Sequence, residues 1–234
     1  LGSVAPVALA TAARAVTFTD VTVAAGIHHR QHDQLPIDRQ VEPYMTGGAA
    51  AGDFDADGWT DLYFTRLDGS DVLYRNQGNG TFLDVTESAF GADHLHDVQT
   101  NGAAWGDVDN DYDLDLYVTS QFSNRYHLFI NNGQGEFSEQ AVARGAAIAG
   151  DDQHFGFSAS FGDYDRDGFL DLHVTEWRAA HNNPTGARQN TRLLRNRGTS
   201  APGHFVDVTD AAGVAMDAVQ STNPNTNSQS FTSR

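Results

Sequence analysis

Short runs of alternating apolar and polar residues recur along the chain, separated by turns rich in Asn, Asp and Gly. Alternation with a period of two predicts strands, and no stretch has the periodicity of a long helix. The runs form a unit of four predicted strands that occurs three times. In strand order, the copies are 48–51, 102–105 and 157–160, which are rich in small residues; 62–65, 116–119 and 172–175; 72–75, 127–130 and 192–195; and the Phe-x-Asp-Val-Thr-like phrases 81–86, 136–139 and 204–209.

Asn and Gly residues join the third and fourth predicted strands in two of the units. Asn76–Gly80 and Asn131–Gly135 supply the residue types that adopt positive φ in hairpin turns. Four short antiparallel strands, repeated at intervals of roughly 50 residues, are typical of a β-propeller blade. We therefore predict an all-β fold of about three propeller blades, with units at about 46–87, 100–140 and 156–209.

The segments outside these units resemble parts of further blades. Val16–Thr22 repeats the fourth-strand phrase, and Ser228–Ser233 resembles the start of a first strand. Residues 1–15 are small and apolar, and Ala13-Arg14-Ala15 resembles the end of a signal peptide. Residues 1–15 are thus either a signal remnant or a retained N-terminal arm, and the propeller segment is expected to span 16–234.

An acidic loop of constant form separates the first and second predicted strands of each unit. The loops begin at Asp53, Asp107 and Asp163, which lie 54 and 56 residues apart (107 − 53 and 163 − 107). Each has carboxylates at positions 1, 3, 5 and 9, and the first and third have glycine at position 6. This spacing turns successive carboxylates toward one point, where they repel one another unless a cation lies among them. A single acidic run is usually a solvated turn, but three in register indicate a metal site.

Oxygen ligands in a flexible loop suit Ca²⁺ better than a transition metal. The backbone carbonyl at position 7 would add another oxygen, as it does in other calcium loops. An EF-hand does not fit, because position 12 holds Phe64, Val118 or Val174 in place of Glu. We predict three Ca²⁺ sites, whose ligands are Asp53, Asp55, Asp57, Trp59 and Asp61; Asp107, Asp109, Asp111, Asp113 and Asp115; and Asp163, Asp165, Asp167, Phe169 and Asp171.

The second loop departs from the pattern at position 6, where Tyr112 replaces glycine. Either Tyr112 adopts a strained turn or the loop deforms. Asp113 adds a carboxylate, although its backbone carbonyl at position 7 is the expected ligand. We therefore expect the second site to be the weakest of the three.

Composition narrows the class of partner. The net charge of −17 disfavours nucleic acid, because phosphate recognition requires a basic surface. Thirteen of the 31 acidic residues lie in the three loops, so much of this charge is concentrated at the proposed metal sites. There is no cysteine, which excludes disulfides and thiol catalysis. No run approaches the roughly 18 apolar residues of a membrane span. Calcium loops of ordinary affinity fill outside the cytosol, which predicts an extracellular location.

Two further sets of residues have both a functional and a structural interpretation. Histidines that precede the units could converge on a second metal or a ligand, or simply lie on the surface; they are His28, His29, His32, His94, His96 and His154. Aromatic side chains could stack on sugars, as in propeller lectins, or pack between blades; they are Trp59, Trp105, Phe155, Phe161 and Trp177. The sequence has no nucleophile elbow, zinc-protease motif or phosphate loop, so we expect no enzyme activity.

Five phrases of the sequence resemble the FG-GAP (or VCBS) repeats of integrin-α-type β-propellers. Three contain the acidic loops, GDFDADGWTDLYFT, GDVDNDYDLDLYVTS and GDYDRDGFLDLHVTE, and two lie between them, LYRNQGNGTFLDVT and LFINNGQGEF. The resemblance covers about Val16 to Arg234 and is closest to the cartilage acidic protein-like family and its bacterial relatives. It implies calcium on the loops between first and second strands, secretion or display at the cell surface, and a role in adhesion or matrix interaction without catalysis.

Propellers of this family usually have seven blades, so three blades cannot close a ring. The exposed blade faces and terminal strands are therefore expected to meet a protein partner or a second copy of the chain. Two alternatives remain, a carbohydrate-binding, lectin-like propeller and the non-catalytic propeller part of a larger secreted hydrolase.

Overall fold

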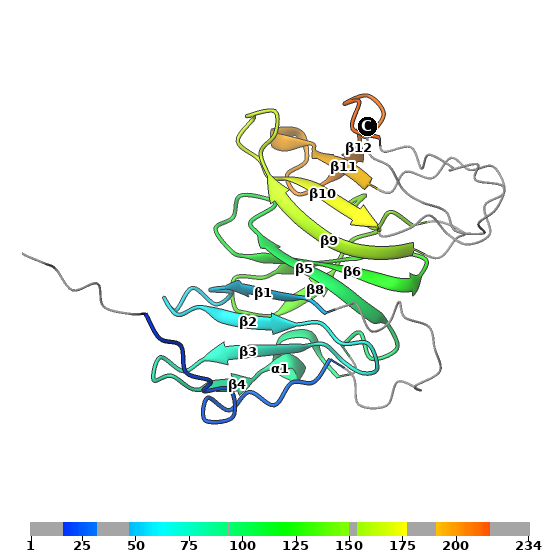
Figure 1. Cartoon of the computed structure of the whole chain (residues 1–234). Coiled ribbons are helices and arrows are strands. Elements are labelled where there is room, and N and C mark those ends of the chain that lie inside the picture. The colour runs from blue at the N-terminus through cyan, green and yellow to red at the C-terminus, as the bar shows by residue number, and fades with distance from the viewer. Residues whose placement is uncertain (1–15, 32–46, 93, 150–153, 177–190, 216–234) are drawn as a thin grey trace, which may run out of the picture.

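The computed structural model describes residues 16–31, 47–92, 94–149, 154–176 and 191–215, and it confirms an almost all-β chain (Figure 1). Three four-stranded antiparallel units follow one another within these ranges. The strands are β1 (Ala49–Gly52), β2 (Asp61–Phe64), β3 (Val72–Asn76) and β4 (Phe82–Asp84); β5 (Gln99–Gly106), β6 (Asp115–Ser123), β7 (His127–Asn131) and β8 (Phe137–Glu139); and β9 (His154–Gly162), β10 (Asp171–Glu176), β11 (Thr191–Asn196) and β12 (Phe205–Asp207).

The three units share one register, which begins at the leucine that follows each acidic loop. Leu62 pairs with Tyr74, and the equivalent leucines of the second and third units pair with Phe129 and Leu194. Because side chains alternate between the two faces of a strand, this shared register gives every unit the same pair of faces.

Glycines shape the hairpins as the sequence predicts. In the turn between β3 and β4, Gly78 and Gly80 have φ of 69° and 87°. In the turn between β7 and β8, Gly133 and Gly135 have φ of 74° and 77°. These values lie in the left-handed region that other residues rarely enter, so the turns require glycine.

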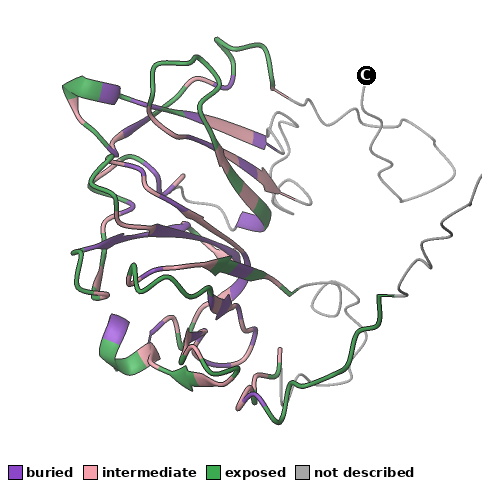
Figure 2. Cartoon of the chain, turned by 90° about the vertical axis from the view of Figure 1, so that its left-hand side faces the viewer, coloured by how far each residue is buried: buried purple, intermediate pink, exposed green. Residues whose placement is uncertain are grey.

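The units pack face to face as blades, with the second between the other two (Figure 1). The first and second blades share a buried cluster that includes Tyr63, Leu73 and Phe129. The second and third share another that includes Tyr117 and Leu172. Figure 2 shows the buried segments running through the strands of the central blade, where β7 is buried along its whole length.

Glycines at the ends of the first strands allow the blades to approach closely. A Cβ atom at Gly52 would lie 2.9 Å from the Trp105 ring, and one at Gly106 would lie 2.7 Å from the Phe161 ring. Trp105 and Phe161 therefore pack between blades, which is the structural role that the sequence left open for them.

β6 extends beyond its own blade. It has nine residues, whereas β2 has four and β10 has six. Near its end, Gln121 lies opposite Phe155 and Ser123 lies opposite His154 on β9, with a register shift between the two pairs. The second and third blades are consequently joined in one sheet, while the first blade forms a separate sheet.

The N-terminal part of the described chain differs from the prediction of a fourth strand. Val16–Thr22 has no strand pairing and runs into a turn at 22–26. The amide of Ala25 donates to the carbonyl of Val21 at 2.7 Å, and equivalent bonds form the turns after β8 and β12. The phrase thus keeps the turn of a blade but forms no strand, because no third strand lies beside it among the described residues.

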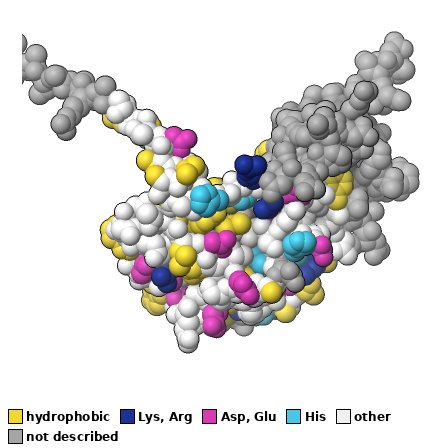
Figure 3. Space-filling view, turned by 90° about the horizontal axis from the view of Figure 1, so that it is seen from below, with side chains coloured by type: hydrophobic (Ala, Val, Ile, Leu, Met, Phe, Trp, Pro, Cys, Tyr) yellow, Lys and Arg dark blue, Asp and Glu magenta, His cyan; other side chains and the backbone are white. Residues whose placement is uncertain are grey.

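This segment occupies the place of a preceding blade's outer end. The carbonyl of Ala25 accepts the amide of Phe82 at 2.8 Å, just as the carbonyl of Arg144 accepts the amide of Phe205 at 2.7 Å between the second and third blades. Phe18 is 96% exposed, whereas the equivalent Phe205 is 6% exposed. Figure 3 views the molecule from the first-blade side, where hydrophobic, acidic and histidine side chains share the surface.

Helical structure is limited to single turns in the described ranges. α1 (Thr86–Phe90) follows β4, and η2 is a 3-10 turn at Gly198–Ser200. None of the described helices combines the length and apolar character required to cross a membrane. The expected N-terminal arm at 1–15 and the expected first strand at Ser228–Ser233 lie outside the described residues.

Candidate metal centres

Each acidic loop closes around the carboxylate at its first position. In the first loop, Asp53 accepts the amides of Asp57 and Gly58 through its two oxygens, at 3.0 and 2.9 Å. Asp57 in turn accepts the amide of Trp59 at 2.9 Å. The second and third loops repeat all three bonds at 2.9 to 3.1 Å. The three loops therefore have one geometry.

The carboxylate at position 9 attaches each loop to its own blade. Asp61 accepts the amide of Phe54 at 3.1 Å and that of Asn76, at the end of β3, at 2.7 Å. Asp115 and Asp171 accept the equivalent amides in their own blades. These three carboxylates are at most 1% exposed, so the end of each loop is held inside the blade.

Three carboxylates of each loop bring ligand atoms within 4.8 Å of one another. The first loop contributes positions 1, 3 and 5, and the other two contribute positions 1, 3 and 9. The groups are Asp53, Asp55 and Asp57; Asp107, Asp109 and Asp115; and Asp163, Asp165 and Asp171. The remaining predicted carboxylates, Asp61, Asp111, Asp113 and Asp167, belong to the same loops but not to these groups. The proposed position-7 carbonyl ligands, at Trp59, Asp113 and Phe169, remain a prediction.

The aspartates at position 3 of the first two loops give the strongest indication of a bound cation. The Oδ1 atoms of Asp55 and Asp109 are buried and have no hydrogen-bond partner among the described residues. Their Oδ2 atoms face arginines, at 3.8 Å from Arg75 and at 3.0 Å from Arg144 respectively. A buried carboxylate oxygen without a partner is costly, and coordination to a metal ion is one way to satisfy it. The donor set is all oxygen, which fits Ca²⁺.

The raised pKa values of the loop carboxylates also indicate a cation site. Burial raises the pKa of Asp61 to about 6 and that of Asp115 to about 7. Burial also raises the pKa of Asp55 and of Asp109, and repulsion from the position-5 carboxylate of the same loop adds to both shifts. A divalent cation among these groups would favour their ionised form and reverse the shifts.

The second loop keeps its geometry despite Tyr112. Tyr112 has φ of 76°, close to the 90° of Gly58 and the 89° of Gly168, so it adopts the strained turn and the loop does not deform. Its side chain is 93% exposed. A second strained position was not predicted: at position 4, Ala56, Asn110 and Arg166 have φ of 56°, 61° and 61°. Of these, only Asn110 is a residue type that tolerates this region well.

An asparagine that was not predicted as a functional residue links each of the first two loops to the blade that follows it. Asn131, at the end of β7, donates its side-chain amide to the carbonyl of Phe54 at 2.8 Å. Asn196, at the end of β11, donates to the carbonyl of Val108 at 2.7 Å. The signal was present in the sequence, because Asn recurs at the end of all three third strands. The first two acidic loops are therefore parts of the blade interfaces.

The other candidate sites do not assemble in the same way. No described histidine belongs to a group of three metal-ligating side chains. His94 Nε2 lies 2.9 Å from the Tyr63 hydroxyl, which donates to Asp71 at 2.6 Å. His154 Nδ1 lies 2.8 Å from Glu176 Oε1. These two histidines are therefore buried partners in polar networks, and His32 lies outside the described residues.

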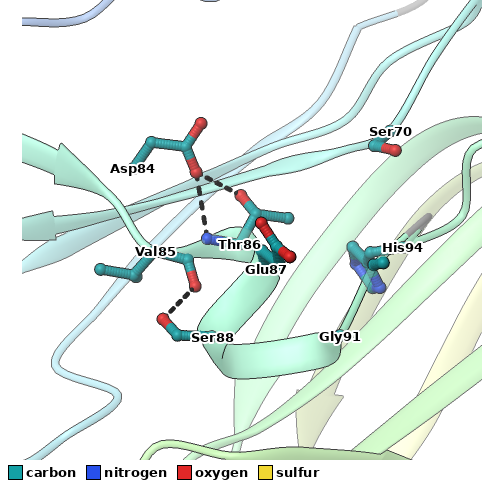
Figure 4. Close-up of a pocket in the computed structure, with 9 residues that line it drawn as sticks. Ser70, Asp84, Val85, Thr86, Glu87, Ser88, Gly91 and His94 are labelled. Carbon is teal, nitrogen blue, oxygen red and sulfur yellow. Dashed lines mark hydrogen bonds between the residues drawn. The ribbon is translucent and has the colours of Figure 1, made fainter.

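His94 also borders an open pocket of about 980 Å³ beside α1 (Figure 4). Much of its polar lining is already paired. Asp84 accepts the amide and hydroxyl of Thr86 at 3.0 and 2.7 Å, and the Ser88 hydroxyl donates to the carbonyl of Val85 at 2.8 Å. These bonds stabilise the start of the helical turn, which is a structural role.

The remaining aromatic candidates for sugar stacking differ in exposure. Phe155 is 3% exposed, and Trp59, on the first acidic loop, is 51% exposed. Trp59 lies against the hairpin turn, because a Cβ atom at Gly78 would be 2.8 Å from its ring nitrogen. Trp177 lies outside the described residues.

Comparisons with known proteins found structural neighbours and a matching family model. A lectin from Agrocybe aegerita, described as specifically recognising non-reducing terminal N-acetylglucosamine, is similar in structure, with 17% sequence identity and a TM-score of 0.44. The match covers 69% of this chain and 37% of that chain, so the chain spans little more than a third of the lectin's length. No curated protein matches the sequence.

A family model described as an FG-GAP-like repeat matches residues 53–118 and 107–174. Each match begins at the first carboxylate of one acidic loop and ends within the second strand of the next blade, β6 or β10. Together they span 53–174, which is just over half of the chain and includes all three loops. The chain belongs to the FG-GAP-like repeat family.

Proposed function

We propose that this chain is an extracellular calcium-binding β-propeller module with a structural, adhesive or protein-interaction role. The observation that carries the proposal is the convergence of three carboxylates in each of three loops of one geometry. The unpartnered buried oxygens of Asp55 and Asp109 support it. Asp53 and its equivalents would bind the ion and so fix the conformation of the loop. The position-9 carboxylates, which accept amides of the strands, would connect the ordered loop to its blade.

The proposed role of Ca²⁺ is to stabilise the blade interfaces. The loops contact the next blade through Asn131 and Asn196, so a disordered loop would also lose these contacts. An ion that binds only the folded state stabilises it by mass action. The abundance of Ca²⁺ outside the cytosol supports the proposed extracellular or cell-surface setting.

Calorimetry of the calcium-loaded chain, with and without a chelator, tests this function. We expect the chelator to lower the melting temperature and isothermal titration to show three Ca²⁺ per chain. Asp55→Asn and Asp109→Asn should each remove one ion. Ser138→Asn, at an exposed position of β8, is the matched control and should remove none. An unchanged melting temperature with chelator would refute the calcium role.

We further propose that the module acts by binding a protein, either a partner or a second copy, through its blade faces and N-terminal segment. Val16, Phe18 and Val23 are 81%, 96% and 77% exposed, in a segment that carries the turn of a blade. Exposed apolar residues of this kind favour association. Phe18→Ser should reduce association in light scattering at several concentrations; equal scattering for both proteins would contradict the proposal.

We also propose that the chain has no catalytic activity. The clustered carboxylates that could act in acid–base chemistry are the ones assigned to Ca²⁺, which would keep them ionised and occupied. The part of the propeller formed here could equally serve within a larger secreted hydrolase. Hydrolytic activity from the purified chain itself, lost in Asp55→Asn, would overturn the non-catalytic assignment.

A further inference from the structure

A second polar site lies at the ends of β5 and β6 that point away from the acidic loop. It is a cavity of about 390 Å³ whose lining includes Gln99, Gln121, Phe122 and Asp97. The cavity is situated where β6 leaves its own blade to pair with β9. Its volume falls within the range of about 300–1,000 Å³ that is usual for small-molecule sites.

Two amide oxygens in this lining have no partner. Gln121 is 3% exposed, and its Oε1 has no hydrogen-bond partner among the described residues. The same holds for Oε1 of Gln99, which is the cross-strand neighbour of Gln121. Turning one amide around would pair at most one of these oxygens with the other side chain. Because a buried acceptor without a donor is destabilising, the site favours a ligand that donates hydrogen bonds.

The backbone beside Gln121 is strained. Phe122 has φ of 54°, a left-handed conformation that is unfavourable for a non-glycine residue. Its ring packs edge-on against Phe155, with centroids 5.0 Å apart and planes at 76°. Strain of this kind tends to persist at binding sites, and here it places an aromatic side chain in the wall of the cavity.

The charge of the lining restricts the ligand further. The lining contains no Lys or Arg, and Asp97 is its sole acidic side chain, so the lining offers nothing to attract an anion. The Asp97 carboxylate lies 3.2 Å from His96 Nδ1. A single exposed carboxylate with two amide oxygens is a weak donor set for a hard cation. A neutral molecule with several hydroxyl donors and one apolar face fits the lining better.

We propose that this cavity binds a neutral saccharide unit. Hydroxyl groups of the sugar donate to Oε1 of Gln99 and Gln121, whose side-chain amides turn toward the cavity on binding because both oxygens are closed to solvent in the ligand-free chain. The apolar face of the sugar ring lies against Phe122. This inference goes beyond the calcium module and does not depend on it, because the cavity and the acidic loop are at opposite ends of the same two strands.

Titration of the calcium-loaded chain with the methyl glycosides of glucose, galactose, mannose and N-acetylglucosamine tests the proposal, with the side-chain amide signals of Gln99 and Gln121 followed by NMR. We expect at least one glycoside to shift both signals at millimolar concentration. Gln121→Leu should weaken binding by about tenfold, the equivalent of one lost hydrogen bond of about 1.4 kcal/mol. Its folding stability should not fall, because the variant removes an unpaired acceptor. Gln134→Leu, at an exposed turn position, is the control and should bind normally.

A second variant keeps the test decisive if Gln121→Leu does not fold. Phe122→Gly relieves the positive φ and removes the aromatic wall, so it should fold and bind the glycoside less tightly. The proposal is overturned if no glycoside shifts the two signals, or if Phe122→Gly binds as tightly as the original chain. A shift caused by added Ca²⁺ and by no glycoside would also overturn it.

Discussion

The side-chain amide of Asn131 in the second blade donates to the backbone carbonyl of Phe54 in the acidic loop of the first blade, at 2.8 Å. The same amide lies 3.2 Å from the carbonyl of Leu114 in the loop of its own blade. One side chain therefore joins two acidic loops that are 54 residues apart along the chain. Through this contact, order in one candidate metal site supports the next.

Replacing Asn131 by Ala should destabilise the chain by roughly 2–4 kcal/mol, because one buried and one partly buried carbonyl lose their donor. Asn76→Ala is the matched control. Asn76 holds the equivalent place in the first blade and accepts the amide of Gly78 as Asn131 accepts that of Gly133, but among the described residues its side-chain amide donates only to the carbonyl of Thr60, at 3.0 Å, in an exposed setting. That variant should cost about 1 kcal/mol or less. Urea unfolding measures both. Equal losses would show that the contact between blades adds nothing.

The effect of Ca²⁺ on stability should increase with pH. Burial raises the pKa of Asp61 to about 6 and of Asp115 to about 7 from an ordinary value of 3.8. In the calcium-free chain, these groups contribute stability that is present below pH 3.8 and is lost as pH rises through about 6 to 7. Bound Ca²⁺ reverses this by favouring the carboxylates.

The difference in melting temperature between calcium-loaded and chelated protein should therefore be small near pH 5 and large near pH 8. Chelators bind Ca²⁺ less tightly in acid, so calcium-free protein prepared by dialysis is the necessary control at each pH. A difference that does not change with pH would argue against the raised carboxylate pKa values.

Tyr112→Gly should strengthen the second calcium site. Tyr112 occupies φ of 76°, where glycine has no steric cost. Relief of about 1 kcal/mol corresponds to roughly fivefold tighter binding. Gly58→Tyr is the reciprocal control and should weaken the first site by a similar factor. Calcium titration of both variants would show whether position 6 limits affinity; no gain in Tyr112→Gly would mean that the strain is compensated within the loop.

Much of this architecture follows from the sequence, for identifiable reasons. Alternation and Asn-Gly turns give the strands, and the spacing of Asp53, Asp55 and Asp57 gives the loop, because both depend on residues close in the chain. The strain at Ala56 carries no such signal, since alanine has no preference for positive φ. The Asn131–Phe54 bond was missed because it joins residues 77 apart, and its detection requires the packing of two blades.

The segment Val16–Thr22 also shows that local sequence does not reveal contacts between distant parts of the chain. Its residues repeat a fourth strand, and its turn forms as in the other copies. A strand, however, also needs a neighbour to receive its hydrogen bonds, and no local pattern supplies that neighbour. The cavity at Gln121 was likewise invisible, because β6 meets β9 there through a contact between blades.

Acid should destabilise the interface between the first and second blades through two buried histidines. Burial lowers the pKa of His94 to about 3 and of His127 to about 4, and His127 adds to the shift of His94. Lowered values mean that their contribution to stability is present above pH 6.5 and is lost as pH falls toward 3 to 4. Both ring nitrogens of His127 are buried and have no hydrogen-bond partner among the described residues.

His127→Phe should consequently leave stability at pH 7 unchanged or higher and shift the acid unfolding midpoint to lower pH. The substitution keeps an aromatic ring stacked on Phe129 while removing the group that must take up a proton. His96→Phe, at an exposed position, is the control and should leave the midpoint in place. Circular dichroism across an acid titration measures both, and an unmoved midpoint in His127→Phe would exclude this residue as a cause of acid unfolding.

A pair of glycines distinguishes a covered blade face from an open one. Gly106 ends β5, and a Cβ atom there would lie 2.7 Å from the Phe161 ring of the next blade. Gly162 ends β9 at the equivalent place, where a Cβ atom would meet nothing within 4 Å among the described residues. Gly106→Ala should therefore cost roughly 1–3 kcal/mol by overpacking, whereas Gly162→Ala should change stability by less than about 0.5 kcal/mol.

The same pair tests whether the third blade has a partner in solution. Tyr164, at position 2 of the third loop, is 47% exposed, whereas the equivalent Phe54 and Val108 are 5% and 0% exposed because the next blade covers them. If a second copy packs on this face, Gly162→Ala should destabilise the protein at high concentration and not at low concentration, since only the associated form has an aromatic ring to displace. Thermal unfolding at several concentrations decides the matter. A concentration-independent loss would mean that residues of the same chain cover Gly162, and no loss at any concentration would show that the face remains open.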